Sequence, residues 1–136
     1  MEKFNSQTCT TREQSERLIA LGLKKETADM CHTPFRSKVN GETLEYTEHC
    51  SLPHGKDIPA WSLHRLIEMM PNNIHRYNDI ADLSVSNELV QYRFYDVDYN
   101  HDVCLEHFND GTLYDNIIDC IEWLIKEGYF NKEYLV

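Results

Sequence analysis

The sequence lacks any long apolar run and is poor in glycine and proline, with 5 and 4 of them in 136 residues. No stretch approaches the roughly 20 apolar residues that span a bilayer, and residues 1–11 lack the basic start and apolar stretch of a secretory signal. We therefore expect a soluble, cytoplasmic protein without a membrane partner. The P-loop, the dinucleotide-binding glycine fingerprint and the nucleophile elbow of hydrolases are also missing. An enzyme is therefore the minority hypothesis, and we identify no catalytic residue.

Basic residues are nearly absent from about a third of the chain. Residues 77–125 carry eleven acidic side chains and a single base, Arg93, whereas residues 1–76 hold ten of each and residues 126–136 hold two of each. The whole net charge of -10 therefore belongs to this segment. Concentrated negative charge attracts cationic surfaces. Binding of nucleic acid instead requires clustered lysine and arginine side chains, which release the counterions of the phosphates. The sequence predicts a protein partner with a basic surface and disfavours direct binding of nucleic acid.

The spacing of the five cysteines is not that of a disulfide framework. The chain is also large enough to bury a hydrophobic core without disulfide bonds. We interpret them as reduced thiols. Residues of zinc-binding type occur between positions 31 and 54, but no CxxC pair anchors a site there. We predict neither a metal nor another cofactor.

Three segments carry helix signals. Thr10 or Thr11 can cap a helix that ends near Gly22, and Thr112 can cap one that ends at Gly128. Between them, apolar residues are spaced for one helical face before Pro71 stops the pattern: Leu63, Leu66, Ile67 and Met70. Residues 27–30 are expected to add a short helical turn.

Strand signals lie between these helices. Asn40-Gly41 is typical of a hairpin turn between residues 35–39 and 42–47, and Pro34 is expected to break whatever precedes it. Residues 77–83, 89–97 and 103–108 are predicted strands, whereas 48–59 are predicted to be a loop. Because hairpins rather than crossovers connect the strands, we expect an α+β fold: a small antiparallel sheet with about three helices packed mainly on one face. This length favours a single globular domain over residues 1–136, with 1–9 poorly ordered.

The turn between the last two strands combines acidic and aromatic residues. Asp96, Asp98 and Asp102 resemble the first half of a calcium loop, but histidines replace its glycine and closing glutamate, so a solvated turn is the better explanation. From this region and the start of the second helix we select a candidate binding surface: Asp96, Asp98, Asp102, Glu106, Tyr95, Tyr99 and Trp61. Trp61 fits either a rim, where tryptophan often anchors partners, or the core, which we favour.

Several short motifs are distributed over most of the chain: Glu13-Gln14-Ser15, Leu21-Gly22-Leu23, Thr27-Ala28-Asp29-Met30, Ile58-Pro59-Ala60-Trp61-Ser62-Leu63, Asp115-Asn116 and Trp123-Leu124. In these motifs the chain resembles a group of small uncharacterised proteins from gut Bacteroides, their phages and mobile elements. The resemblance implies a cytoplasmic accessory protein. It carries over no catalytic or binding residue, because the group has no assigned activity.

Two hypotheses of function follow. The leading one is a non-enzymatic protein-binding or regulatory module whose acidic face docks a basic surface, with mimicry of nucleic acid as one version. The alternative is a small metal-dependent enzyme that uses the acidic 96–102 segment. Both are compatible with a homo-oligomer.

Overall fold

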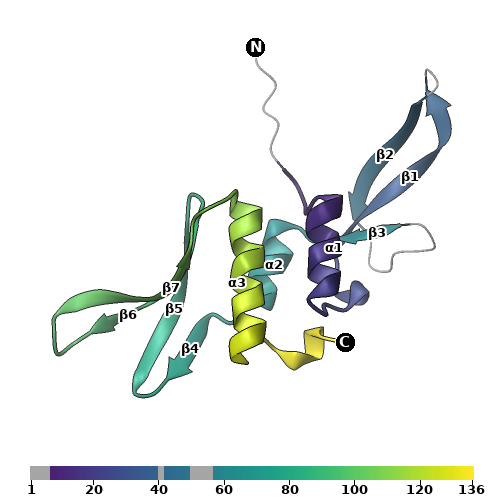
Figure 1. Cartoon of the computed structure of the whole chain (residues 1–136). Coiled ribbons are helices and arrows are strands. Elements are labelled where there is room, and N and C mark those ends of the chain that lie inside the picture. Colours follow the sequence, from purple (N-terminus) through teal and green to yellow (C-terminus); the bar gives the residue numbers. More distant parts are fainter. Residues whose placement is uncertain (1–6, 40–41, 50–56) are drawn as a thin grey trace, which may run out of the picture. The chain divides into compact units, whose positions relative to one another are not determined.

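The computed structural model describes residues 7–39, 42–49 and 57–136, and it divides the chain into two compact units (Figure 1). Unit 1 comprises residues 1–66 and 133–136, and unit 2 comprises residues 67–132. Among the described residues, three α-helices and two antiparallel sheets form an α+β fold, which confirms the predicted fold class. The expected single sheet is replaced by a three-stranded sheet in unit 1 and a four-stranded sheet in unit 2.

In unit 1, helix α1 (Arg12–Ala20) begins and ends where its capping residues predict. The Thr11 hydroxyl accepts a hydrogen bond from the Gln14 N–H at 3.2 Å, and the Gln14 side chain accepts one from the Thr11 N–H at 3.0 Å. These two bonds complete a capping box. Gly22 follows the helix with a φ of 103°, which L side chains rarely adopt. The predicted turn at 27–30 is displaced: the short 3-10 helix η1 spans Lys25–Thr27.

The sheet of unit 1 has the order β2-β1-β3, with β1 at Met30–Val39, β2 at Glu42–His49 and β3 at Ile58–Ala60. The predicted hairpin is confirmed in its two strands, whereas its turn at 40–41 lies outside the described residues. Pro34 does not break the chain, and β1 runs through it. Since β3 pairs only with residues 30–32, β1 has a single neighbour at Pro34 within the described part of the sheet. Proline, which lacks an N–H, is tolerated at such an edge position.

A partly buried polar network joins the residues just before β1 to those at the start of helix α2 (Leu63–Met69). The indole Nε1 of Trp61 donates to the Thr27 hydroxyl at 3.0 Å, and Trp61 itself has no exposed surface. The Asp29 carboxylate accepts from the Ser62 N–H at 2.8 Å and from the Ser62 hydroxyl at 2.5 Å. Ser62 in turn accepts from the Arg65 N–H at 3.2 Å, so it caps the first turn of α2. The motifs at 27–30 and 58–63 are therefore structural partners.

The sheet of unit 2 has the order β4-β5-β6-β7 and is antiparallel throughout. Its strands are β4 (Asn73–Arg76), β5 (Asp79–Ser86), β6 (Leu89–Asp96) and β7 (His101–Phe108). The last two confirm the predicted strands to within two residues, whereas β4 was not predicted. Each turn contains a non-glycine residue with positive φ: Tyr77, Asn87 and Asn100. This conformation at Tyr77 explains why β5 starts later than predicted.

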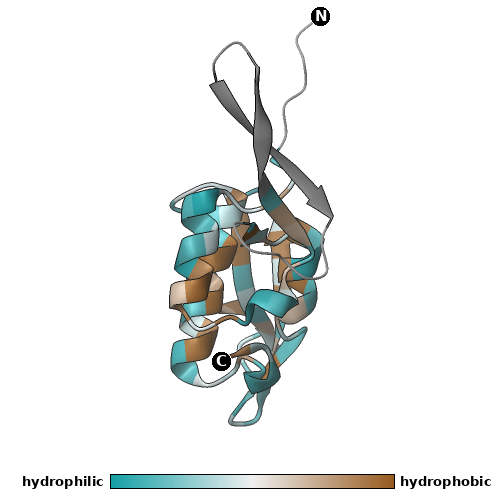
Figure 2. Ribbon diagram, turned by 90° about the vertical axis from the view of Figure 1, so that its right-hand side faces the viewer, coloured by the Kyte–Doolittle hydropathy of each residue, from teal (hydrophilic) through white to brown (hydrophobic). Residues whose placement is uncertain are grey.

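Helix α3 (Leu113–Glu127) packs on this sheet through its apolar stripe, which includes the fully buried Ile117, Ile121 and Leu124. The Trp123 ring lies 6.1 Å from the Tyr92 ring of β6 and 6.2 Å from the Phe108 ring of β7. We call the face that Tyr92 presents to α3 the helix side, and the opposite face the outer side. Figure 2 shows that the helices carry apolar and polar residues on different sides.

The buried Asn116 of α3 fixes the loops at this end of unit 2. Its amide nitrogen donates to the Glu88 carbonyl at 2.6 Å and to the Gly111 carbonyl at 3.0 Å, while its amide oxygen accepts from the Gly111 N–H at 2.9 Å. One side chain thus holds the β5–β6 turn and the segment before α3 against the same helix.

Candidate interaction surface in the β6–β7 hairpin

Six of the seven residues selected from the sequence lie in the β6–β7 hairpin of unit 2. In this hairpin Tyr92 pairs with Glu106, whereas the next residue, Arg93, pairs with Cys104. Leu105 is therefore an extra residue in β7, which makes a β-bulge. A bulge interrupts the alternation of side chains, so sequence spacing no longer tells which side of the sheet a residue of β7 faces.

The bulge separates two of the predicted acidic residues. Glu106 lies opposite Tyr92 and therefore shares the helix side with it. Consistent with this placement, burial and the nearby Glu106 carboxylate raise the pKa of the Cys120 thiol on α3 to about 12. Asp102 instead lies opposite Tyr95, on the outer side. The expected continuous acidic face is therefore corrected: these two carboxylates do not share a face.

Asp102 also loses most of its effect as a free charge, because Arg93 forms an ion pair with it. Both side chains are partly exposed, at 40% for Arg93 and 57% for Asp102. A pair of this exposure stabilises a protein by less than about 1 kcal/mol. Its larger effect is on the surface charge, because Arg93 is the single base of the acidic segment.

Asp96 has a structural role in the turn. Its carboxylate accepts hydrogen bonds from the N–H of Asp98 at 3.0 Å and from the N–H of Tyr99 at 3.4 Å. The Tyr95 hydroxyl donates to the side-chain oxygen of Asn100, whose φ of 53° closes the turn. These local bonds give the turn a defined conformation, with Asp98 exposed between them.

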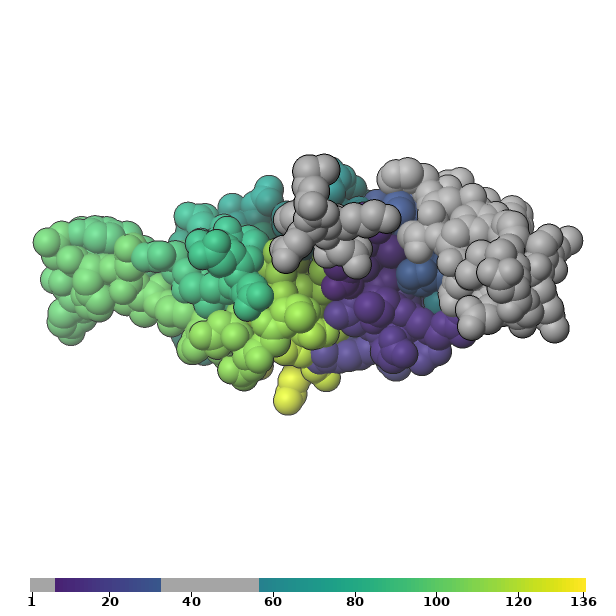
Figure 3. Space-filling view, turned by 90° about the horizontal axis from the view of Figure 1, so that it is seen from above, coloured from purple at the N-terminus to yellow at the C-terminus, as the bar shows by residue number. Residues whose placement is uncertain are grey.

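Three large apolar side chains are exposed around this turn. The exposed fractions are 53% for Tyr95, 81% for Val97 and 76% for Tyr99. We call residues 95–100 the hairpin tip. Figure 3 shows the green β6–β7 region that includes it standing out from the rest of unit 2. The exposure of Val97 was not predicted, although an apolar residue between two aspartates in a turn was a visible signal.

The structure also bears on Trp61 and on the acidic turn. Trp61 is not part of this surface, because it is buried in unit 1. The carboxylates at 96, 98 and 102 do not form a metal site: within the described residues, no three His, Cys, Asp or Glu side chains are grouped so that they could hold an ion. The residues of zinc-binding type between positions 31 and 54 are Cys31, His32, His49, Cys50 and His54. Of these, Cys50 and His54 lie outside the described part of the chain, and His32 is bonded through Nε2 to the Thr10 carbonyl at 2.7 Å.

Comparisons with protein-family models, with curated proteins and with solved structures found no match for this chain. In the part of the chain that the structure describes, no helix combines the length and the apolar character needed to cross a membrane.

Proposed function

We propose that this chain is a non-enzymatic protein-binding module that docks a basic surface of its partner on the hairpin tip. The observation that carries the proposal is the exposure of Tyr95, Val97 and Tyr99 at a turn that also presents Asp98. Aromatic side chains that already hold a fixed conformation are frequent anchors of protein interfaces. The local hydrogen bonds of the turn reduce the entropy that binding would otherwise cost.

Electrostatics supports a basic partner. Unit 2 contains 13 acidic and four basic side chains, a net charge of -9. One of those four bases, Arg93, is already paired with Asp102. Long-range attraction of this sign accelerates encounter with a cationic surface, while the apolar tip supplies the contact.

The proposal does not extend to mimicry of nucleic acid. Mimicry needs carboxylates in a regular series along one face, whereas Glu106 lies on the helix side and Asp102 is paired. The same placement gives no support to a metal-dependent enzyme. The bacteroidal and phage resemblance agrees with an accessory binding role, and we keep it as part of the proposal.

The test is capture of a partner by the immobilised chain, followed by affinity measurement with that partner purified. Replacing Tyr99 with serine should weaken binding by at least about tenfold, because central aromatic contacts are worth about 2 kcal/mol or more. The double change Asp96→Asn and Asp98→Asn should slow association, and the amide at 96 still offers an oxygen to the turn. The matched control is Asp110→Asn with Glu127→Gln, an equal charge change at exposed residues outside the tip.

We expect the control variant to bind nearly as well as the unmodified chain. Added salt should weaken the binding of both chains less than it would weaken a purely electrostatic contact. Equal binding by the Tyr99→Ser variant and the unmodified chain would remove the hairpin tip as the docking site.

A further inference from the structure

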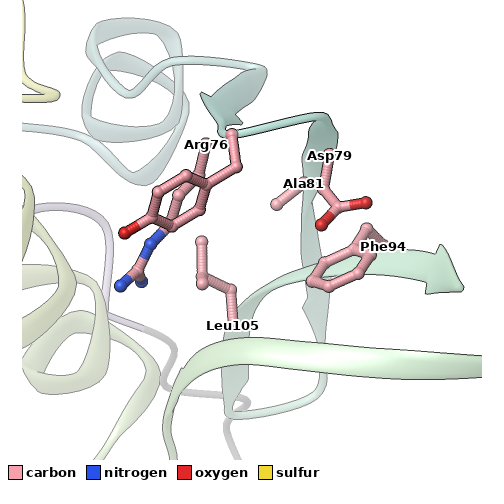
Figure 4. A pocket seen from close by; sticks show the side chains of 6 residues that line it. Arg76, Asp79, Ala81, Phe94 and Leu105 are labelled. Carbon is pink, nitrogen blue, oxygen red and sulfur yellow. The ribbon is translucent and has the colours of Figure 1, made fainter.

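A small pocket opens on the helix side of the same sheet, close to the base of the β6–β7 hairpin (Figure 4). It has a volume of about 170 Å³ and is lined by residues of four strands and one turn: Arg76, Tyr77, Asp79, Ala81, Phe94 and Leu105. Phe94 follows Tyr92 by two positions in β6, which places both side chains on the helix side. Leu105 reaches the pocket from the bulge of β7.

The floor of the pocket is apolar and its rim is charged. Ala81 is 2% exposed, so a small side chain leaves the space that the pocket occupies. In Figure 4 the Asp79 carboxylate lies beside Phe94, whereas the Arg76 guanidinium lies on the opposite side of the pocket. That guanidinium is 5.8 Å from the centre of the Tyr77 ring, a distance typical of a cation–π contact. The contact leaves the guanidinium positively charged, so the rim carries one charge of each sign, with Asp79 on the side of Phe94.

The size of the pocket suits one large apolar side chain. An apolar cavity of about 150 Å³ accepts benzene, so about 170 Å³ accommodates one phenyl ring or one leucine-sized group. The net charge of unit 2 and the carboxylate at the rim favour a positive charge beside that group.

We propose that this pocket receives a large apolar side chain, flanked by lysine or arginine, from the partner protein. The inference rests on the proposed function and gives the basic partner a specific anchor on the helix side. It predicts that recognition depends on both the ring and the adjacent cation. The electrostatic preference comes from Asp79, and Arg76 opposes it.

The test uses the full chain labelled with nitrogen-15 and three blocked peptides: acetyl-Lys-Phe-Lys-amide, acetyl-Lys-Ala-Lys-amide and acetyl-Glu-Phe-Glu-amide. Titration with the first should give saturable shifts of the amide signals of Ala81, Phe94 and Leu105. The alanine peptide should bind at least about tenfold more weakly, because burial of a phenyl group contributes on the order of a tenfold to hundredfold gain. The glutamate peptide should bind more weakly than the lysine peptide.

Two variants on β5 distinguish the contribution of the pocket carboxylate to peptide binding from the effect of the overall negative charge. Asp79→Asn should weaken the lysine peptide about twofold to fivefold, the range for a solvent-exposed ion pair. Asp82→Asn is the matched control. Asp82 is also exposed and lies on the same strand, but it is opposite Arg93 in the strand register and therefore faces the outer side. Arg76→Gln should leave binding unchanged or strengthen it.

The inference is overturned if none of the three pocket amides shifts, if Asp82→Asn weakens binding as much as Asp79→Asn, or if Arg76→Gln abolishes it. Binding of 2-phenylethylammonium without binding of the lysine peptide would also overturn it, because the occupant would then be a small amine. The purified peptides require no contact with the hairpin tip. Loss of the peptide signal therefore rejects the pocket alone, whereas an unaffected Tyr99→Ser variant rejects the docking site.

Discussion

Replacement of Asn116 with leucine should destabilise unit 2 by about 3 kcal/mol. Leucine has the same branched arrangement of four side-chain heavy atoms and is not smaller, so none of this loss comes from a cavity. The loss comes instead from the three hydrogen bonds of the amide, at 2.6, 3.0 and 2.9 Å. A buried hydrogen bond contributes about 0.5–1.5 kcal/mol to the free energy of unfolding, and the sum of three gives the estimate.

The distribution of tryptophan provides the assay. The chain has two tryptophans, and Trp61 belongs to unit 1 whereas Trp123 belongs to unit 2. In a Trp61→Phe background, urea denaturation followed by fluorescence therefore reports on the environment of Trp123. Thr112→Ala in the same background is the control, because loss of that N-cap should cost about 1 kcal/mol. If Asn116→Leu lowers the free energy of unfolding by less than the control does, the amide does not hold the two loops as described.

Three further predictions concern stability and charge. Burial raises the pKa of Cys120 from 9.0 to about 12, so its contribution to stability is fully present below pH 9 and is lost as the pH rises towards 12. Urea titrations at pH 8 and 10 should show a loss of about 1.4 kcal/mol per pH unit above 9, and Cys120→Ala should show a smaller slope. Trp61→Phe should lower the free energy of unfolding by about 2 kcal/mol, because it removes the bond to Thr27 and buried ring area, and an unchanged thermal midpoint would contradict this. Arg93→Gln should change stability by less than about 1 kcal/mol, and a larger loss that persists in 1 M salt would show that the pair is not a surface interaction.

Local signals predicted the helices and the longer strands well. Thr11 with Gln14, and Thr112 with Gly128, mark helix ends through hydrogen bonds made within a few residues, which sequence spacing can represent. Strands β3 and β4 were missed because segments of three and four residues are too short to show alternation. Pro34 was misinterpreted because its tolerance depends on which neighbour β1 has at that point, a property of the sheet rather than of the local sequence.

The site was predictable in composition but not in arrangement. The exposed positions of Tyr95 and Tyr99 agree with their selection for a candidate binding surface. The pairing of Arg93 with Asp102 depends on the register between two strands, and the pocket depends on Ala81, Phe94 and Leu105 meeting from three strands. The hydrogen bond of the Trp61 indole reaches Thr27, a residue 34 positions away. None of these contacts between distant residues produces a periodic pattern in the sequence from which it could be predicted.

The extra residue in β7 makes strand length, as well as amino-acid type, a determinant of surface chemistry. If β7 kept Leu105 but lost the bulge, Leu105 would pair with Tyr92, and Glu106 would pair with Gln91 on the outer side that Asp102 faces, while every charged residue stayed the same. A chain of this kind could therefore acquire a new electrostatic pattern by a one-residue shift of strand register, without the stepwise replacement of acids and bases.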